Sequence, residues 1–405
     1  MENIKSFIIV FICVLVVSCS NDDNSIPIII TIKDFTTTIT ETPEENDEIG
    51  IIEATTNRGK LLFTLIDEKP EGAVIIDPTG KLTVKNASLF DSKVYPKLTA
   101  SLLVMNEQVS KEATIKIIIK NSDDKIHFSD ENFKKALVKQ DDPIIDINND
   151  SEISFKEAKE IEKINLVGIS EEITDIAGIE NFTNLKWFGI QSNTLKEVDL
   201  SNNIVLEEFH SPFTIAIETI NVSNNPKLKV LSLPVNKIET IDISSCINLE
   251  ELSINTNKLI SLDISKNTKL KVLSCGSNRL KTIDVTKNVF LEKLNIGYGV
   301  FALTNDNNIE EIDLSNNIKL KNLDCYQNLL TRLDLSNNPE LERLNVSNNK
   351  LTFLNLKNGA TANLEKNVRI ENNASTLCVQ VDTPSASYIA DWTKDSDTQF
   401  KSVCD

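Results

Sequence analysis

Residues 146–157 have the composition and spacing of a site for a hard metal ion. Residues that can supply oxygen ligands occupy alternate positions, and a last one follows two residues later: Asp146, Asn148, Asp150, Glu152, Ser154 and Glu157. Calcium takes six to eight oxygen ligands, from carboxylates, amides, hydroxyls and backbone carbonyls. A tight loop that turns every second residue toward one centre can collect these ligands from a single segment. The segment therefore predicts a calcium site.

This spacing resembles the twelve-residue loop of the EF-hand family, with Glu152 as a backbone-carbonyl ligand and Glu157 as a bidentate one. The sequence departs from the family twice. Ser151 replaces the glycine of a left-handed turn, at a cost of roughly 1 kcal/mol, and Pro143 interrupts the entering helix. Alternatively, Ser154 and Glu157 form only a capping box that starts the next helix. The two interpretations are compatible, and the resemblance implies weak, extracellular-type calcium binding.

Two short helices are expected to position the loop. Residues 128–140 have helical apolar spacing with Ser129 or Asp130 as N-cap, and a second helix is expected at 155–161. We expect residues 128–160 to cover the apolar end of the segment that follows.

That following segment contains an internal repeat. A phrase of the form Asp-Leu-Ser-Asn-Asn recurs, and its acidic or amide residue falls at Asp199, Asn221, Asp242, Asp263, Asp284, Asp313, Asp334 and Asn355. Successive steps are 22, 21, 21, 21, 29, 21 and 21 residues. A second phrase, Leu-x-x-Leu-x-Φ-x-x-Asn, ends in asparagine at Asn236, Asn257, Asn278, Asn328 and Asn349, with Gly299 in the slot of the irregular repeat. A fixed period of this length predicts a solenoid.

The two phrases resemble the leucine-rich-repeat family in a short version of about 21 residues per coil, and the repeat length and cysteine usage are similar to internalin-like bacterial surface proteins. Period-2 alternation in each phrase predicts a coil with a sheet on either side. The asparagines are expected to point inward and bond the backbone of adjacent coils. The long step inserts eight residues near 300–307, either as a binding loop or as a tolerated insertion.

Outward positions of the Leu-x-x-Leu strands hold the candidate ligand-binding residues Trp187, His210, Tyr326 and Arg343. Aromatic and arginine side chains dominate recognition surfaces, although either aromatic ring could instead pack on a neighbour. On the other side of each coil, the recurring aspartates form a row with a spacing of about 4.8 Å. We interpret this row as side chains bonded to turn amides; a row of metal sites is the alternative.

Residues 26–121 are rich in short alternating β-runs separated by Pro, Gly and Asn turns, which predicts a β-sandwich. The order of motifs resembles a cadherin repeat. Of the calcium ligands that this resemblance implies, Glu41 and Asp91 match, but Lys93 replaces a second acid and Asp77 lacks an acid two residues on. We expect the cadherin-like fold without most of its calcium sites.

The N-terminus reads as a bacterial lipoprotein leader. An apolar run from Phe7 to Val17 is too short to span a membrane and has the length of a signal h-region. The following Ser18-Cys19 resembles a lipobox, in which Cys19 would carry the lipid. The acidic residues 20–25 are similar to the surface-export signal of Bacteroidota lipoproteins, which implies the outer face of the outer membrane; a plain linker is the alternative.

The remaining cysteines divide into two groups. Cys246, Cys275 and Cys325 lie at inward repeat positions and are expected to be buried thiols. The tail resembles the C-terminal cap of Bacteroidota leucine-rich-repeat proteins, and there a Cys378–Cys404 disulfide would contribute roughly 3 kcal/mol in an oxidising compartment.

The expected fold is mostly β: a cadherin-like sandwich, a short helical cap and a leucine-rich-repeat solenoid. The predicted divisions are 1–19 signal peptide, 20–25 acidic linker, 26–121 sandwich, 122–163 helical cap with the EF-hand-like loop, 164–358 solenoid and 359–405 disulfide-closed cap.

Composition narrows the function. A net charge of −18 argues against nucleic acid or an anionic membrane surface as partner, and 2 histidines with 11 glycines leave little room for common catalytic motifs. We therefore expect no enzyme. The sequence favours a lipid-anchored adhesin that binds a protein or glycan; a structural spacer or accessory subunit of a surface complex is the alternative.

Overall fold

The structure is a computed structural model, and it describes residues 27–41, 43–106, 109–121, 123–192, 194–297, 307–364 and 367–404. The chain divides into two compact units, Met1–Asn121 and Ser122–Asp405. Both consist mainly of β-strands, and the described helices are few and short. The predicted fold class, mostly β with a leucine-rich-repeat solenoid, is confirmed; the cadherin likeness of the first unit stays a prediction.

The first unit is built from three small sheets around one apolar core. Its four-stranded sheet has the order β2-β9-β8-β5, in which β2 runs parallel to β9 and the other pairs are antiparallel. The strands are β1 (Ile30–Ile32), β2 (Phe35–Thr40), β3 (Glu48–Ile51), β4 (Ala54–Thr56), β5 (Leu62–Lys69), β6 (Val74–Ile76), β7 (Lys81–Val84), β8 (Lys97–Asn106) and β9 (Val109–Lys120), with a 3-10 turn at Ala87–Leu89. Leu82, Leu102 and Val104 are fully buried between the sheets.

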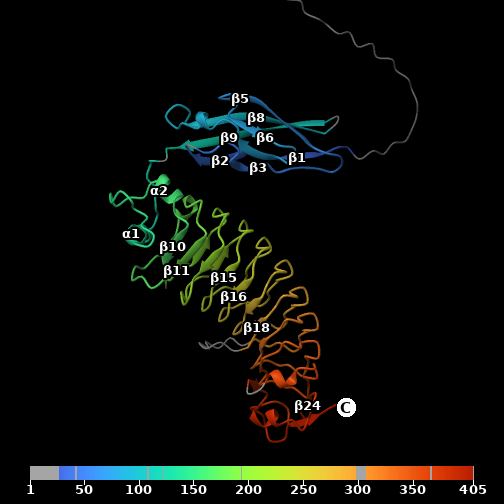
Figure 1. Cartoon of the computed structure of the whole chain (residues 1–405). Helices are drawn as coiled ribbons and strands as arrows, with labels where there is room; N and C mark the ends of the chain where they lie inside the picture. Colours follow the sequence, from blue (N-terminus) through green and yellow to red (C-terminus); the bar gives the residue numbers. More distant parts are fainter. Residues whose placement is uncertain are drawn as a thin grey trace, which may run out of the picture. The chain divides into compact units, whose positions relative to one another are not determined.

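The second unit is a solenoid with one continuous parallel sheet of ten strands (Figure 1). Each coil contributes one strand, and the central residue of nearly every strand is fully buried, as Leu252 and Leu273 are. The strands are β10 (Lys163–Leu166), β11 (Trp187–Ile190), β13 (Glu208–His210), β15 (Val230–Ser232), β16 (Glu251–Ser253), β17 (Val272–Ser274), β18 (Lys293–Asn295), β19 (Asn322–Asp324), β21 (Arg343–Asn345) and β23 (Val368–Arg369). We call this sheet the main sheet.

The opposite side of the solenoid is less regular than the sequence predicts. Strands pair there only at the two ends of the described solenoid: β12 (Glu197–Asp199) with β14 (Thr219–Asn221), and β20 (Arg332–Asp334), β22 (Phe353–Asn355), β24 (Cys378–Gln380) and β25 (Gln399–Lys401) in order. The middle coils are joined by isolated backbone bonds such as Lys258 N–H to Ile238 O, at 2.9 Å. The expectation of a sheet on both sides of every coil is therefore wrong for these coils. The buried asparagines described next hold the turns together without a strand ladder.

Two rows of buried asparagines bond successive coils. In the first row, Asn257 Nδ2 donates to Leu233 O of the preceding coil, at 2.9 Å, and its Oδ1 accepts from Ile238 N at 3.0 Å. The second row, which the sequence reading did not assign, comprises Asn203, Asn225, Asn267, Asn288, Asn317 and Asn338, all fully buried. Cys246 takes one slot of the second row and reaches Val222 O through its Sγ, at 3.6 Å.

The irregular repeat requires a correction. Gly299, which the sequence assigned to the asparagine slot, lies outside the described residues, as does most of the insertion near 300–307. Asn307 fills the slot instead: its Nδ2 donates to Cys275 O and Ile296 O at 3.0 Å, and its Oδ1 accepts from Leu280 N at 3.0 Å. The buried amides need an amide side chain, and the extra residues let the chain return with one.

A small helical cap begins the second unit. Helix α1 (Glu131–Lys139) starts at Asp130, whose Oδ1 accepts from Asn132 N and Phe133 N at 2.7 and 3.1 Å. Helix α2 is Phe155–Lys159, and 3-10 turns follow at Ile179–Asn181, Thr361–Leu364 and Ser387–Asp391. Phe133 and other buried residues of the cap share one apolar core with the first solenoid coils, so the cap closes that end of the core.

Candidate binding surface and metal loop

The loop at 146–157 is held by two buried carboxylates. Asp146 and Glu157 are only 5% and 7% exposed. Asp146 accepts from Asp150 N and Ser151 N at 3.2 and 2.9 Å, and Glu157 Oε1 accepts from Ile147 N at 3.0 Å. Ser151 has φ of 62°, so the serine adopts the left-handed turn that the family fills with glycine. The backbone amides thus fold the loop around its first and last acids.

Glu157 also makes the predicted capping box. Its Oε2 accepts from Ser154 N and Oγ at 2.9 Å, and Ser154 Oγ accepts from Glu157 N at 3.2 Å. The cap interpretation is therefore confirmed, and it leaves the metal interpretation open because carboxylate oxygens have more than one lone pair.

Two lysines neutralise the outer acids of the loop. Lys125 Nζ lies 2.9 Å from Asp150 Oδ2, and Lys134 Nζ lies 2.6 Å from Glu152 Oε1. Within the described residues, no group of three or more His, Cys, Asp or Glu side chains converges on a common metal position. The donors nevertheless fit calcium by type, since all are oxygens, and Asp146 and Glu157 are buried without a cation among their hydrogen-bond donors.

The main sheet carries the predicted ligand-binding residues on its outward side, in two groups. At the N-terminal end, Trp187 of β11 stacks on His210 of β13 with ring centroids 5.2 Å apart. Lys163 Nζ lies 5.4 Å from the centroid of the Trp187 ring, and His210 Nε2 lies 3.0 Å from Glu208 Oε2. A Cβ atom on Gly189 would collide with the indole, so the ring lies across this glycine. Trp187 is therefore both a recognition candidate and a packed neighbour.

The second group lies near the C-terminal end of the main sheet. Asp324 and Arg343 are on the adjacent strands β19 and β21, and Tyr326 follows β19. Burial raises the pKa of Asp324 above its ordinary value, and the charges of Arg343 and Arg369 offset this only in part. A half-buried carboxylate beside two guanidinium groups gives this end a mixed-charge recess.

The four predicted residues are thus brought together as two pairs, Trp187 with His210 and Tyr326 with Arg343. Five strand spacings, about 24 Å, separate β13 from β19. Between the pairs the third strand residues are small: Ser232, Ser253 and Ser274. One compact ligand cannot touch both pairs, whereas an extended one can.

Sequence reasoning missed Lys163 and Arg369 on this face. Lys163 precedes the first recognisable repeat, and Arg369 follows the last one, yet both belong to strands of the main sheet. Arg369 is paired with Glu371 at 2.6 Å. Counting back and forward from the repeat by one coil would have found both positions.

The aspartate row on the opposite side has the turn bonds that our first interpretation requires. Each Oδ1 accepts from the backbone N–H two residues on, as in Asp242 with Ser244 and Asp263 with Ser265, both at 2.9 Å. These bonds hold the pKa of both carboxyl groups below its ordinary value. The row is thereby explained as turn structure without a metal.

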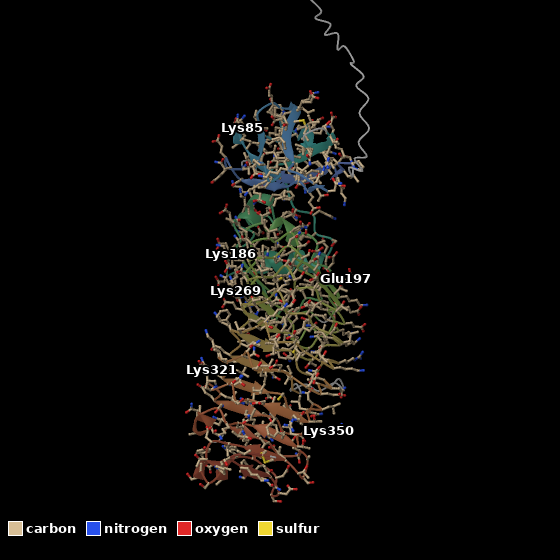
Figure 2. The ribbon with its side chains drawn as sticks, turned by 90° about the vertical axis from the view of Figure 1, so that its right-hand side faces the viewer. Lys85, Lys186, Glu197, Lys269, Lys321 and Lys350 are labelled. Carbon is tan, nitrogen blue, oxygen red and sulfur yellow. A yellow bond between two sulfur atoms is a disulfide. The ribbon has the colours of Figure 1, made fainter. Side chains whose placement is uncertain are left out.

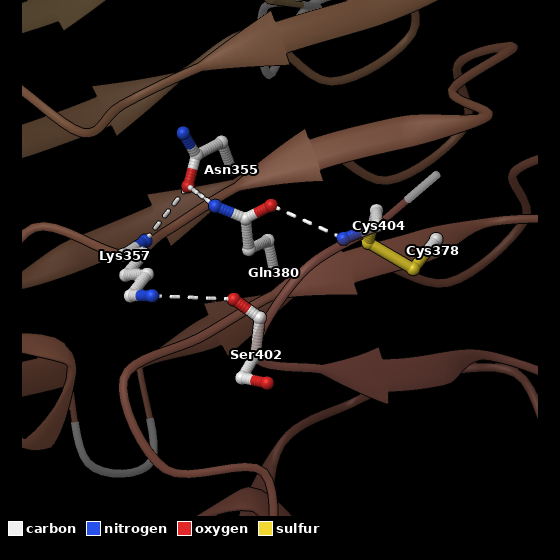
Figure 3. The surroundings of a disulfide bond; sticks show 6 residues. All are labelled: Asn355, Lys357, Cys378, Gln380, Ser402 and Cys404. Atoms are coloured by element: carbon white, nitrogen blue, oxygen red, sulfur yellow. Dashed lines mark hydrogen bonds between the residues drawn. A yellow bond between two sulfur atoms is a disulfide. The ribbon is translucent and has the colours of Figure 1, made fainter.

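The cysteines lie as follows. Cys246, Cys275 and Cys325 are buried free thiols, and burial raises the pKa of Cys246 to about 11 and that of Cys275 to about 12. Cys378 and Cys404 form a disulfide across 26 residues (Figure 3). Beside it, Gln380 Oε1 accepts from Cys404 N at 3.2 Å, and Gln380 Nε2 donates to Asn355 at 3.3 Å.

In the sandwich, the predicted ligand positions serve turns. Glu41 Oε2 accepts from Ser92 Oγ at 2.7 Å, and Asp91 Oδ1 accepts from Lys93 N at 2.8 Å. Cys19, the leader and the acidic linker lie outside the described residues. No helix in the described part of the chain is long and apolar enough to cross a membrane.

No protein-family model matches the chain, and no curated protein sequence matches it. Among solved structures, the functional domain of InlJ from Listeria monocytogenes is 24% identical with a TM-score of 0.44; the match covers 68% of this chain and 60% of that one. An internalin from the same organism is 19% identical with a TM-score of 0.41, over 68% of this chain and 91% of that one. Cadherin domains of protocadherin gamma B2 are 18% identical with a TM-score of 0.22, over 25% of this chain and 24% of that one.

This chain therefore spans 60% of the InlJ domain that it matches. At these identities the similarity concerns the fold alone. The repeat class itself is set by the coils described above: a leucine at the centre of most main-sheet strands, an inward asparagine after them, and mostly about 21 residues per coil.

Proposed function

We propose that the chain is a binding protein that recognises a protein or a glycan through the outward face of the main sheet. The observation that carries this proposal is the uneven pattern of that face. Aromatic and charged side chains gather at its two ends, around Trp187 and around Arg343, and serines line the middle. Aromatic rings and arginines are the side chains that contribute most to binding energy.

The alternative is a structural spacer or an accessory subunit of a surface complex. One observation favours it: Trp187 already packs on His210 and across Gly189, so its exposed area is reduced. A spacer has no need of the mixed-charge recess at Asp324, which is why binding is the preferred proposal.

The test is binding by the chain without its first 25 residues on protein arrays and glycan arrays. Hits are then measured with two double variants, Trp187→Ala with His210→Ala and Tyr326→Ala with Arg343→Ala. The matched control is Glu239→Ala with Lys258→Ala, an ion pair away from this face. We expect at least one face variant to weaken binding about tenfold or more, as loss of a binding hot spot does, while the control binds normally. No hits, or hits that both face variants retain, would favour the spacer.

We further propose that the 146–157 loop binds calcium as a structural ion. The side chains of Asp146, Asn148, Asp150, Ser154 and Glu157 and the carbonyl of Glu152 would hold it. Bound calcium would supply positive charge beside the two buried carboxylates and brace the cap. With a dissociation constant near 0.1 mM, 2 mM calcium would stabilise the fold by about 2 kcal/mol.

Thermal unfolding with calcium and with chelator tests this proposal. Calcium is expected to raise the Tm of the unmodified chain and of a control, Asp263→Asn with Asp284→Asn, but not that of Asp146→Asn with Glu157→Gln. The readout is the shift on adding calcium, because Glu157 also caps α2 and its loss lowers the Tm by itself. Equal Tm values in both buffers would leave the loop as a helix cap alone.

For localisation, we propose a lipid on Cys19 and display on the outer face of the outer membrane. The support is the lipobox-like leader and the acidic residues after it. Metabolic labelling with a fatty-acid analogue should mark the native chain and not Cys19→Ala, and protease added to intact cells should remove it. Labelled chain that resists protease would place it on the inner side.

A further inference from the structure

One edge of the solenoid combines an alternating charge ladder with exposed apolar residues. At this edge the chain enters the strands of the main sheet, and we call it the leading edge. One residue per coil forms the ladder, in the order Glu162, Lys186, Glu207, Lys229, Glu250, Lys271, Glu292, Lys321 and Glu342. Figure 2 shows Lys186, Lys269 and Lys321 along this edge, with Glu197 and Lys350 along the opposite one.

Within the chain, the ladder is bridged in pairs. Lys186 lies 2.7 Å from Glu162, Lys229 2.6 Å from Glu207, Lys271 2.6 Å from Glu250 and Lys321 3.0 Å from Glu292. Most of these side chains are between 37% and 60% exposed. Each charge therefore keeps solvent-facing room for a further partner of opposite sign.

Beside the ladder, three residues earlier in each coil, runs a row of mostly apolar side chains: Ile204, Pro226, Ile247, Thr268, Val289, Ile318 and Pro339. Ile204 and Ile318 are 54% exposed and Ile247 is 52% exposed. Soluble surfaces tolerate single apolar residues, but an aligned row of them marks an interaction surface.

We propose that the leading edge binds the leading edge of a second copy of this chain, around a two-fold axis normal to the main sheet. Such an axis sets the two solenoids antiparallel, so each ladder residue faces one of the second copy. A strictly alternating ladder then matches opposite charges throughout, provided that the axis falls between two coils. An isologous, self-complementary patch is what a two-fold dimer requires.

One register also suits the neighbouring rows. With the axis between the coils of Glu250 and Lys271, the ladder pairs across copies are Lys186–Glu342, Glu207–Lys321, Lys229–Glu292 and Glu250–Lys271. The apolar pairs are Ile204–Ile318, Pro226–Val289 and Ile247–Thr268. The register one coil-pair further on would place Lys266 opposite Lys287, so like-charge repulsion disfavours it.

The overlap spans eight coils, about 34 Å at one strand spacing per coil. A strip of this length and one edge wide is smaller than the roughly 800 Å² per partner of a stable interface, so the dimer is weak. The axis keeps both main sheets on the same side, and two copies would therefore offer a double-width face to an extended or repeated ligand.

Sedimentation equilibrium of the chain without its first 25 residues tests the proposal, up to about 200 μM protein, a range that suits an interface this small. We expect a monomer–dimer equilibrium that raised salt weakens. Lys229→Glu should weaken association about tenfold or more, because it opposes Glu292 twice in the dimer. Glu292→Lys should do the same.

The double variant Lys229→Glu with Glu292→Lys separates this interface from simple loss of stability. It breaks the two bridges within the chain, to Glu207 and to Lys321, but restores opposite charges across the axis. We expect it to dimerise again. The control, Lys258→Glu, reverses a lysine of the opposite edge and should dimerise normally. A monomer at all concentrations, or a dimer that both single reversals leave intact, would overturn the proposal.

Discussion

Replacing Asn278 by alanine should cost more stability than any comparable change in the second asparagine row. Asn278 is fully buried and makes four hydrogen bonds: Nδ2 donates to Ile254 O, Cys275 O and Gly276 O at 3.0, 3.0 and 3.2 Å, and Oδ1 accepts from Leu259 N at 3.0 Å. A net contribution of about 1 kcal/mol per bond gives a loss of about 4 kcal/mol.

Asn288 in the second row is the matched comparison. It is equally buried, but its Nδ2 makes two bonds, to Ile264 O and Asn267 O at 3.2 and 2.9 Å, and its Oδ1 has no partner among the described residues. Alanine there loses about 2 kcal/mol of bonding and also removes a buried unpaired oxygen, which recovers roughly 1 kcal/mol. The expected net loss is about 1 kcal/mol.

Urea unfolding followed by circular dichroism measures both values. A change in the slope of the transition would show that the coils no longer unfold together, and the midpoints alone would then mislead. Equal losses for Asn278→Ala and Asn288→Ala, or a larger loss for Asn288→Ala, would refute the hydrogen-bond account of the two rows.

Three further outcomes are expected. Thr256→Asn should stabilise the chain by about 1 kcal/mol in urea unfolding, because Thr256 has φ of 58° and a buried unpaired Oγ1, and Asn348 adopts the same conformation one residue before its own row asparagine. Reducing Cys378–Cys404 should lower the unfolding free energy by roughly 3 kcal/mol, compared in buffers with and without reductant. Hydrogen bonds hold the pKa of Asp263 low, so the stability that they give is present at neutral pH and is lost as pH falls below about 4, and Asp263→Asn should flatten an acid-unfolding profile.

The repeat could be read from the sequence because each coil spends the same residues on the same task. A leucine recurs at the buried centre of most main-sheet strands, and an asparagine recurs at the turn after it, so period alone assigns register. The asparagine slot was misassigned at Gly299 because an insertion shifts the count. Only the requirement that Leu280 N and Cys275 O be bonded identifies Asn307.

Backbone conformation was harder to predict. Val235 and Thr256 adopt positive φ immediately before their row asparagines, although β-branched residues disfavour that conformation. Stacking between coils overrides the local preference here, and single-sequence rules do not include such stacking. The same limit explains why strands were expected in the middle coils of the opposite side, where alternation is present but a ladder is not.

The candidate site was predictable by residue type but not by grouping. Trp187 and His210 are 23 residues apart, and their stacking depends on the parallel register that aligns Gly189 with His210. Likewise, Asp324 and Arg369 meet because β21 alone lies between their strands. In the loop, the six oxygen-bearing residues were identified, whereas the lysines that face two of them, Lys125 and Lys134, come from outside the motif.

Net charge is a poor guide to the partners of a solenoid. The chain carries −18, yet the repeat sorts its charges into rows, because one position per coil becomes one line along the surface. The aspartate row concentrates negative charge and uses each carboxylate to bond a turn amide. The leading edge carries nearly equal numbers of both signs in strict alternation, an arrangement that a second copy can match but a uniformly charged polymer cannot. Charge order along each row, rather than the sum over the chain, therefore decides which partner each face can accept.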